Sequence, residues 1–192
     1  MDKELLNRYN ALKAKVTERA DEFSALMDYL ENETEWLVAP ASTRFHLCRE
    51  HGLLEHSVNV AETLIRIKDT IYPVVDDESC IIVALLHDLG KVGMPGEPLY
   101  LKNQPTEKQR RAGYGPTFPY SYNKDLTYLS VPIRGLYIAL PFITLTEDEA
   151  QAIAYHDGQY VDDNKSAAAN ERPLALLLHY ADNWCGFVVE ER

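Results

Sequence analysis

The chain has 192 residues, of which 46% are hydrophobic and 26% are charged, and this composition excludes a disordered chain. Its formal net charge of −11 argues against a broad electrostatic surface for the nucleic-acid backbone, although a few local cations would suffice to hold a small anion. The length predicts one domain over residues 1–192 with a single substantial core.

The N-terminus and the cysteines bear on the location of the protein. The stretch MDKELLNRYNALK is charged and amphipathic, and no apolar run in the chain approaches the length of a membrane span. Cys48, Cys80 and Cys185 are odd in number and unevenly spaced, which favours free thiols in a reducing compartment over a disulfide framework. We therefore expect a cytoplasmic protein with no membrane partner.

Helical periodicity runs through most of the chain, since apolar side chains recur at intervals of three and four residues. The predicted helices cover residues 2–31, about 53–70, from a cap at Asp76 or Asp77 to Leu89, 133–140, from Thr146 onward with Glu149 in the capping-box position, and from Pro173 onward. The first of them makes up most of an N-terminal segment, 1–34, that carries no obvious chemistry. Because no strand alternation or internal repeat is evident, the predicted fold class is all-α.

Residues 92–131 differ from the helical segments in composition. Proline, glycine and tyrosine alternate along the whole stretch, and a loop of this length within a compact domain is usually a lid or a binding element. We therefore predict a long irregular loop that acts as a lid or contacts the substrate. Its tyrosines and cations suit that role, although the basic cluster at 108–111 is more typical of a solvated face.

Three predicted helices carry a polar side chain where an apolar one is expected. His56 and Asp182 each interrupt an apolar stripe, and His87 follows the apolar run IIVALL with an aspartate beside it. Each has an ordinary explanation, because a single buried histidine is usually hydrogen-bonded within a core and Asp182 could pair with Arg172 or Lys91. Taken together, the costs of burying these groups would all be removed by one shared divalent cation.

The motifs GLLEHS at 52–57, HDLGK at 87–91 and HYADNW at 179–184, in this order, resemble the HD superfamily of metal-dependent phosphohydrolases. APASTRFH at 39–46 and LTEDEAQAIAYHDG at 145–158 are similar to small stand-alone HD proteins of bacteria and their phages. The chain is also similar to the HD region of bacterial 3′–5′ exonucleases, without room for their added nucleic-acid-binding domain. The resemblance implies an HD-domain helical bundle, all-α, with a long irregular loop insertion.

The resemblance also implies a set of metal ligands. Carried over by position, His56, His87, Asp88 and Asp182 hold one divalent ion, for which Mn, Fe, Co, Ni, Zn and Mg are all candidates. His156 matches one further ligand position of relatives with two metals, while the other position, near Ser130-Val131-Pro132, has no histidine. His156 is therefore interpreted either as a fifth ligand or as a histidine on the substrate side, and a second ion stays open.

The chemistry of a metal ion bound by these ligands predicts roles in catalysis, and the resemblance strengthens the prediction for Arg44 and His46. Asp88 is expected to orient or deprotonate a metal-bound water. Lys91 is placed to neutralise charge on the phosphoryl group, or it is simply a solvated lysine at a helix end. Arg44 and His46 precede the first ligand helix in a flexible segment, where they are expected to bind the substrate phosphate.

The leading functional hypothesis is hydrolysis of a phosphomonoester or phosphodiester of a small, nucleotide-like molecule by metal-activated water. One alternative is exonucleolytic hydrolysis of nucleic acid, which the acidic balance argues against. Another alternative is a non-hydrolytic metal-binding HD protein, either a sensor or an oxygenase. The expected partner is a small phosphorylated molecule, and the oligomeric state stays open.

Overall fold

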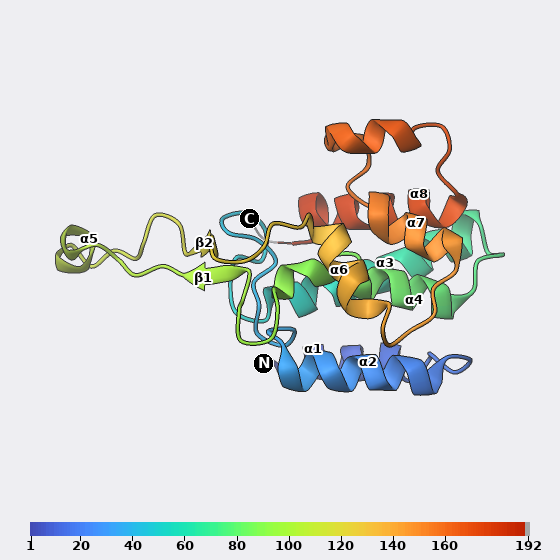
Figure 1. Cartoon of the computed structure of the whole chain (residues 1–192), viewed down its shortest axis with the longest axis horizontal. Coiled ribbons are helices and arrows are strands. Elements are labelled where there is room, and N and C mark those ends of the chain that lie inside the picture. Colours follow the sequence, from blue (N-terminus) through green and yellow to red (C-terminus); the bar gives the residue numbers. More distant parts are fainter. Residues whose placement is uncertain (191–192) are drawn as a thin grey trace.

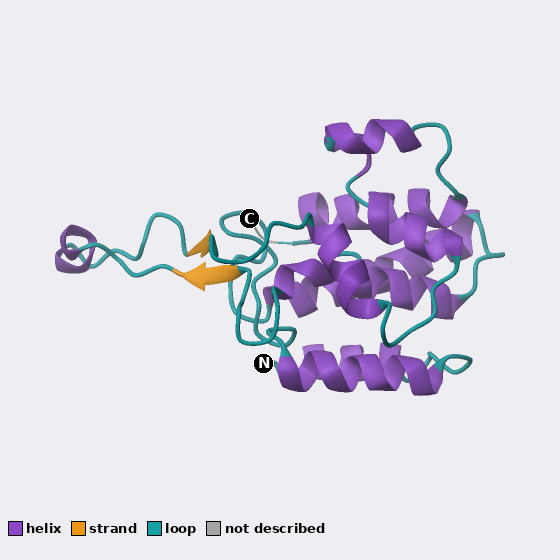
Figure 2. Ribbon diagram, in the orientation of Figure 1, coloured by secondary structure: helices purple, strands orange, loops and turns teal. Residues whose placement is uncertain are grey.

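The structure is a computed structural model of the chain, and it describes residues 1–190. Helices dominate this part of the chain and pack into a bundle, from which a thin two-stranded element projects at one end (Figure 1, Figure 2). The α-helices are α1 Lys3–Lys13, α2 Ala20–Glu33, α3 Gly52–Ile71, α4 Asp77–Leu86, α5 Glu107–Arg111, α6 Val131–Ala139, α7 Glu147–Tyr155 and α8 Pro173–Trp184. The prediction of an all-α fold is confirmed.

Shorter elements connect and extend these helices. Three 3₁₀ turns, η1 Leu89–Val92, η2 Gly158–Tyr160 and η3 Asp162–Ala167, lie in the connections, and a π-helix, η4 Cys185–Val189, directly follows α8. No described helix is both long and apolar enough to cross a bilayer. The three cysteines are free thiols in the structure.

The centre of the bundle is built from α3, α4, α7 and α8, which pack against one another. Residues 80–86 of α4 are apolar, and none of their side chains is accessible to solvent. A helix that is apolar on all sides belongs in the interior of a protein. The C-terminal end of α4, where the HDLGK motif begins, is therefore inside the molecule, and this places His87 and Asp88 at exposed fractions of 0% and 4%.

The N-terminal segment forms a separate layer along one side of the bundle (Figure 1). The prediction of one continuous helix over 2–31 is wrong, because α1 and α2 are separated by residues 14–19. The backbone N–H groups of Thr17 and Glu18 donate hydrogen bonds of 2.7 and 2.8 Å to the carboxylate of Glu78 on α4. Because these two N–H groups bond to Glu78, they do not form the backbone hydrogen bonds of a continuous helix. The same bonds attach the N-terminal layer to the core.

The end of the third predicted helix also differs from expectation. The helix was expected to reach Leu89, but α4 ends at Leu86, and Asp88 adopts φ −102° and ψ 9° before the 3₁₀ turn η1. At Gly90 the start of α6 lies so close that a Cβ atom would be 2.1 Å from the carbonyl oxygen of Val131. In a continued α-helix, neighbouring side chains would point about 100° apart, whereas this turn lets both residues of the HD pair face one centre.

The segment 92–131 contains a small sheet, which the sequence analysis did not predict. Strands β1 Tyr100–Lys102 and β2 Tyr120–Tyr122 pair antiparallel, with Tyr100 opposite Tyr122. Strands of three residues are too short for alternation to be seen in the sequence. The short helix α5 lies at the tip, far from the bundle, and carries the exposed cations of the 108–111 cluster (Figure 1).

Candidate metal centre

The four residues predicted as metal ligands meet at one point. His56 lies in α3, Asp182 in the last turn of α8, and His87 and Asp88 directly follow α4. The Nε2 atom of His56 is 3.0 Å from Oδ1 of Asp182 and 3.3 Å from Nε2 of His87. Oδ2 of Asp88 is 3.6 Å from the His56 Nε2 atom and 3.5 Å from that of His87. Ligand atoms bound at about 2.1 Å to one ion are separated by roughly 3 Å, so this spacing fits a shared first-row metal.

The orientation of the imidazole rings supports this interpretation. Nδ1 of His87 donates to the carbonyl oxygen of Ala84 at 2.7 Å, and Nδ1 of His156 donates to that of Ile153 at 2.9 Å. Each hydrogen bond leaves the Nε2 atom with a lone pair, as a metal ligand requires. The lone pair of His87 then faces Nε2 of His56 in the interior at 3.3 Å, so either a proton on His56 or a metal ion must lie between the two nitrogens. The residues therefore fit a metal ion.

The charge of the site also favours a cation. Burial raises the pKa of Asp182, but the hydrogen bond with His56 outweighs this effect and holds the pKa of that carboxyl far below its ordinary value. Burial lowers the pKa of His56, but hydrogen bonds to Asp182 and Glu190 raise it to about 10. Both shifts have the same origin, an excess of carboxylate charge that attracts either a proton or a metal ion.

Asp88 also interacts with two groups on its other side. Its Oδ2 atom accepts a hydrogen bond from Nζ of Lys91 at 2.5 Å, and its Oδ1 atom is 3.6 Å from Nε2 of His156. Burial raises the pKa of Asp88, but the Lys91 ammonium outweighs burial and holds the pKa well below its usual range. The Lys91 side chain is only 16% exposed, so it faces Asp88 rather than solvent. His87, Asp88 and His156 also lie close enough together to share an ion.

The ordinary explanation for Asp182 as half of an ion pair does not hold. Arg172 lies 3.2 Å from Asp148 instead, and Lys91 pairs with Asp88. Among the described residues, the Asp182 carboxylate has the imidazoles of His56 and His87 as its polar partners. Its position is therefore explained by the same cluster that contains the other three predicted ligands.

The two residues predicted to bind phosphate, His46 and Arg44, lie in different surroundings. The ring of His46 packs against that of His56 with 4.9 Å between centroids, so it borders the metal centre. The exposed Arg44 guanidinium instead lies over the ring of Phe45 at 4.8 Å and that of Phe118 at 5.7 Å. Only His46 is thus placed directly against a predicted ligand.

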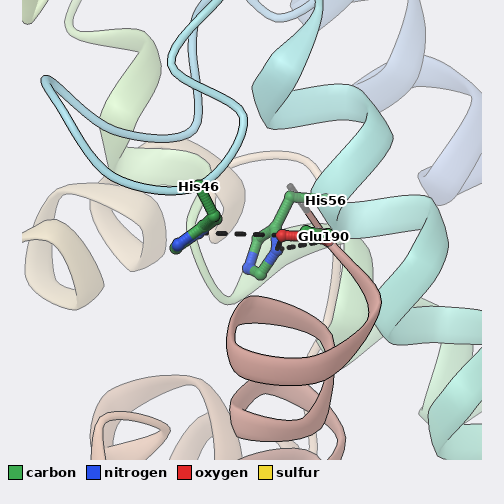
Figure 3. Close-up of side chains that lie close together, drawn as sticks. All are labelled: His46, His56 and Glu190. Carbon is green, nitrogen blue, oxygen red and sulfur yellow. Dashed lines mark hydrogen bonds and ion pairs between the residues drawn. The ribbon is translucent and has the colours of Figure 1, made fainter. Parts of the chain in front are cut away.

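Two carboxylates of the site were missed by the sequence analysis. Both oxygens of Glu190 lie 3.0 Å from Nδ1 of His56 (Figure 3), whereas the predicted ligands His87 and Asp182 contact its Nε2 atom. Oδ1 of Asp157 is 3.7 Å from Nε2 of His156. Glu190 follows an apolar stretch near the end of the sequence, and no local pattern there indicates a contact with a helix that begins at residue 52.

A cavity of about 380 Å³ borders the metal centre, because Asp182, one of the four predicted ligands, lines it. Its lining combines polar residues of the site with aromatic side chains from the 45–46 segment and from the C-terminal part of the chain. These residues are Phe45, His46, Asp157, Tyr160, Asp182, Asn183, Gly186 and Phe187. Two larger hollows of about 900 and 1070 Å³ are lined by none of the four predicted ligands, although Asp157 lines the first and Tyr160, Asn183 and Phe187 line the second. The small cavity is therefore a candidate substrate site beside a predicted metal ligand.

Comparison with known proteins identifies the family. The HD domain family model matches residues 53–184, and this chain belongs to that family. HD domains bind divalent metals and are broadly metal-dependent hydrolases. No curated protein and no solved structure gives a significant match to the chain. All four predicted ligands lie within the matched range, whereas His46 and Glu190 lie outside it.

Proposed function

We propose that this protein hydrolyses a phosphate ester of a small, nucleotide-like molecule with metal-activated water. The observation that carries this proposal is the convergence of His56, His87, Asp88 and Asp182 beside a cavity of ligand size. The contacts between their donor atoms are 3.0–3.9 Å long. Two imidazoles and two carboxylates form a ligand set that suits Mn, Fe, Co, Ni, Zn or Mg. His156 is the candidate for a further ligand.

A bound ion would supply an acidic water ligand and a Lewis acid for one phosphoryl oxygen. Asp88 then accepts the proton of the attacking water. A carboxylate whose pKa is lowered by Lys91 is a weak base, so it is suited to a water that is already acidic. Lys91 keeps Asp88 ionised before the reaction, and its ammonium partly compensates the negative charge that gathers in the transition state.

The lining of the cavity supports a small substrate with an aromatic group. Phe45, Tyr160 and Phe187 provide rings on which a nucleobase stacks, while His46 supplies a hydrogen bond to the phosphate. A volume of about 380 Å³ lies in the usual range of small-molecule sites. Arg44 borders the neighbouring hollow together with Phe45, and we propose it as a contact for a group that extends beyond the cavity.

The same features bear on the two alternatives. An exonuclease needs cations along the path of the strand to the metal, but the basic cluster at 108–111 lies at the far tip of the projecting element (Figure 1). A sensor does not need a buried lysine against the metal-binding aspartate. These observations favour hydrolysis of a small ester over both alternatives.

The test compares metal-stripped protein with protein loaded with Mn²⁺. We expect release of phosphate or of p-nitrophenol from at least one member of a panel of nucleotides and p-nitrophenyl mono- and diesters, and only with the metal. Absence of release from every ester by the loaded protein would contradict the proposal. Cleavage of a labelled single strand in preference to the small esters, with a steep decrease at high salt, would instead support the exonuclease alternative.

A further inference from the structure

We propose that Glu190 is a positioning residue of the metal centre, and that the C-terminal segment after α8 is therefore part of the site. This inference rests on the metal centre of the proposed function. In it, the Glu190 carboxylate holds the imidazole of His56 through Nδ1, so that Nε2 presents its lone pair to the ion.

The contacts of Glu190 define this role. Nδ1 of His56 donates to the carboxylate, with 3.0 Å to each oxygen, and Nδ2 of Asn59 donates to Oε1 at 3.0 Å (Figure 3). His46 lies near the second carboxylate oxygen, with its Nε2 atom 3.9 Å from Oε2 of Glu190. The Glu190 side chain is only 1% exposed. A carboxylate bonded to the outer nitrogen of a ligating histidine fixes both the tautomer and the ring orientation.

The backbone of the C-terminal segment is built to bring Glu190 to this place. In a continued α-helix, residue 190 would lie about 12 Å along the axis beyond Asp182. Instead α8 passes into the π-helix η4, and Glu190 adopts an extended conformation, with its N–H donating to the carbonyl oxygen of Cys185 at 3.0 Å. The thiol of Cys185 donates to Thr63 of α3 at 3.3 Å, which ties the segment to the helix that carries His56. Single π-turns of this kind often occur at functional sites.

The charge of Glu190 also points toward the metal. No lysine or arginine of the described chain forms an ion pair with Glu190, so its titratable neighbours are the imidazoles of His56 and His46. Burying a carboxylate without a compensating cation is costly. A metal ion on the far side of the His56 ring provides that compensation through the imidazole, because the carboxylate makes the ligand nitrogen more electron-rich.

Glu190 lies outside the part of the chain that matches the HD domain family model, which covers residues 53–184. The family match therefore accounts for His56 as a ligand but not for the group that orients it. Asn59, one turn after His56 on α3, provides the second hydrogen bond to Glu190 from within the matched range.

The experiment measures the dissociation constant for Mn²⁺ by calorimetry on metal-stripped protein, together with the unfolding temperature of the metal-free form. Substitution of such an outer partner typically weakens metal binding by about 10–100-fold, and we expect this for Glu190→Ala. The dissociation constant of Glu190→Gln should lie between those of the wild type and Glu190→Ala, since the amide oxygen still accepts a hydrogen bond from Nδ1 but carries no charge. The matched control Glu33→Gln, an exposed residue of α2, should bind as the wild type does.

A purely structural role would lower the unfolding temperature of the metal-free variants without changing the dissociation constant, and that result would overturn the proposal. If Glu190→Ala does not fold, Glu190→Asp and Asn59→Ala decide the question, since both keep a carboxylate near His56 while altering its geometry. Unchanged affinity in both would also overturn it. Failure of the wild type itself to bind any divalent metal would refute the proposed function instead.

Discussion

Two clusters of buried charge in this protein are neutralised in different ways. Between the N-terminal layer and the bundle, the Arg19 guanidinium lies 3.0 Å from Glu78 and 2.7 Å from Glu149. Backbone N–H groups of residues 17 and 18 donate further hydrogen bonds to the Glu78 carboxylate, and the hydroxyl of Ser79 donates to Glu149 at 2.7 Å. In this cluster the chain itself supplies the partners of both carboxylates. We call Arg19, Glu78 and Glu149 the closed cluster.

The metal centre is not closed in this way. Asp88, Asp182 and Glu190 bring three carboxylates together, and Lys91 is the ammonium that pairs with one of them. The remaining neighbours are imidazoles, two of which face each other through Nε2. From this comparison we infer that a buried charged cluster is structural where the chain neutralises it, and that it is a candidate binding site where neutralisation calls for an ion from solution.

The largest effect is expected from removal of a metal ligand. His87→Ala should reduce the metal content of the purified protein from close to one ion per chain to background, because it removes the imidazole at the centre of the donor set. Elemental analysis measures this directly. His51→Asn serves as the control, since asparagine tolerates the left-handed backbone at that position (φ 67°), and its metal content should not change. Full metal occupancy of His87→Ala would remove the basis for the site.

Breaking the closed cluster should affect stability without affecting the metal. Arg19→Met leaves Glu149, whose side chain is inaccessible to solvent, without its guanidinium. Removal of one partner of such a pair typically costs about 3 kcal/mol in the free energy of unfolding. Urea denaturation measures the loss, and the Mn²⁺ dissociation constant of the folded variant should equal that of the wild type. A large change in that constant would show that the two clusters are coupled.

Metal removal should lower the stability of the protein only through the metal centre. An ion present at 100 times its dissociation constant adds about 2.7 kcal/mol to the stability of the folded state. We therefore expect chelation to lower the unfolding temperature of the wild type and of Arg19→Met by similar amounts, as followed by circular dichroism. His87→Ala should show no such decrease, and a decrease of equal size in that variant would place the ion elsewhere.

The closed cluster should also make stability dependent on pH. Burial raises the pKa of Glu78 and of Glu149, but hydrogen bonds from Arg19 and from the backbone outweigh it and hold both pKa values below the ordinary 4.5. A carboxyl with a lowered folded-state pKa stabilises the protein above 4.5 and loses this contribution as pH falls through the folded-state value. The unfolding free energy of metal-free protein should fall on acidification below 4.5, and more steeply in the wild type than in Arg19→Met. Equal slopes would contradict this assignment.

The smallest effect is expected at the tip of the projecting element. Arg110→Gln combined with Arg111→Gln should change the free energy of unfolding by no more than about 0.5 kcal/mol, since both side chains are exposed. Hydrolysis of small esters should be unchanged because α5 lies far from α3, α4 and α8 of the bundle (Figure 1). A strong loss of activity on single-stranded nucleic acid, measured beside the small esters, would revive the exonuclease alternative.

The sequence by itself determined the features that depend on neighbouring residues. The capping box of Thr146 with Glu149 and the cap at Asp76 are both present, because each involves hydrogen bonds that span only three residues. Polar residues on apolar stripes also indicated which side chains face inward, and the ordered HD motifs indicated that His56 and Asp182 belong to one site. Periodicity and spacing suffice for such inferences because helical geometry fixes the direction of each side chain.

The tertiary structure alone decided where the chain departs from its local pattern. The break between α1 and α2 depends on Glu78, which lies about 60 residues away along the chain. The partner of His56 at Nδ1 is 134 residues distant, and Arg44 packs on aromatic rings although it lies two residues from His46. Each outcome is set by which surfaces meet once the core has formed, and a contact between distant residues leaves no periodic signal in the sequence around either of them.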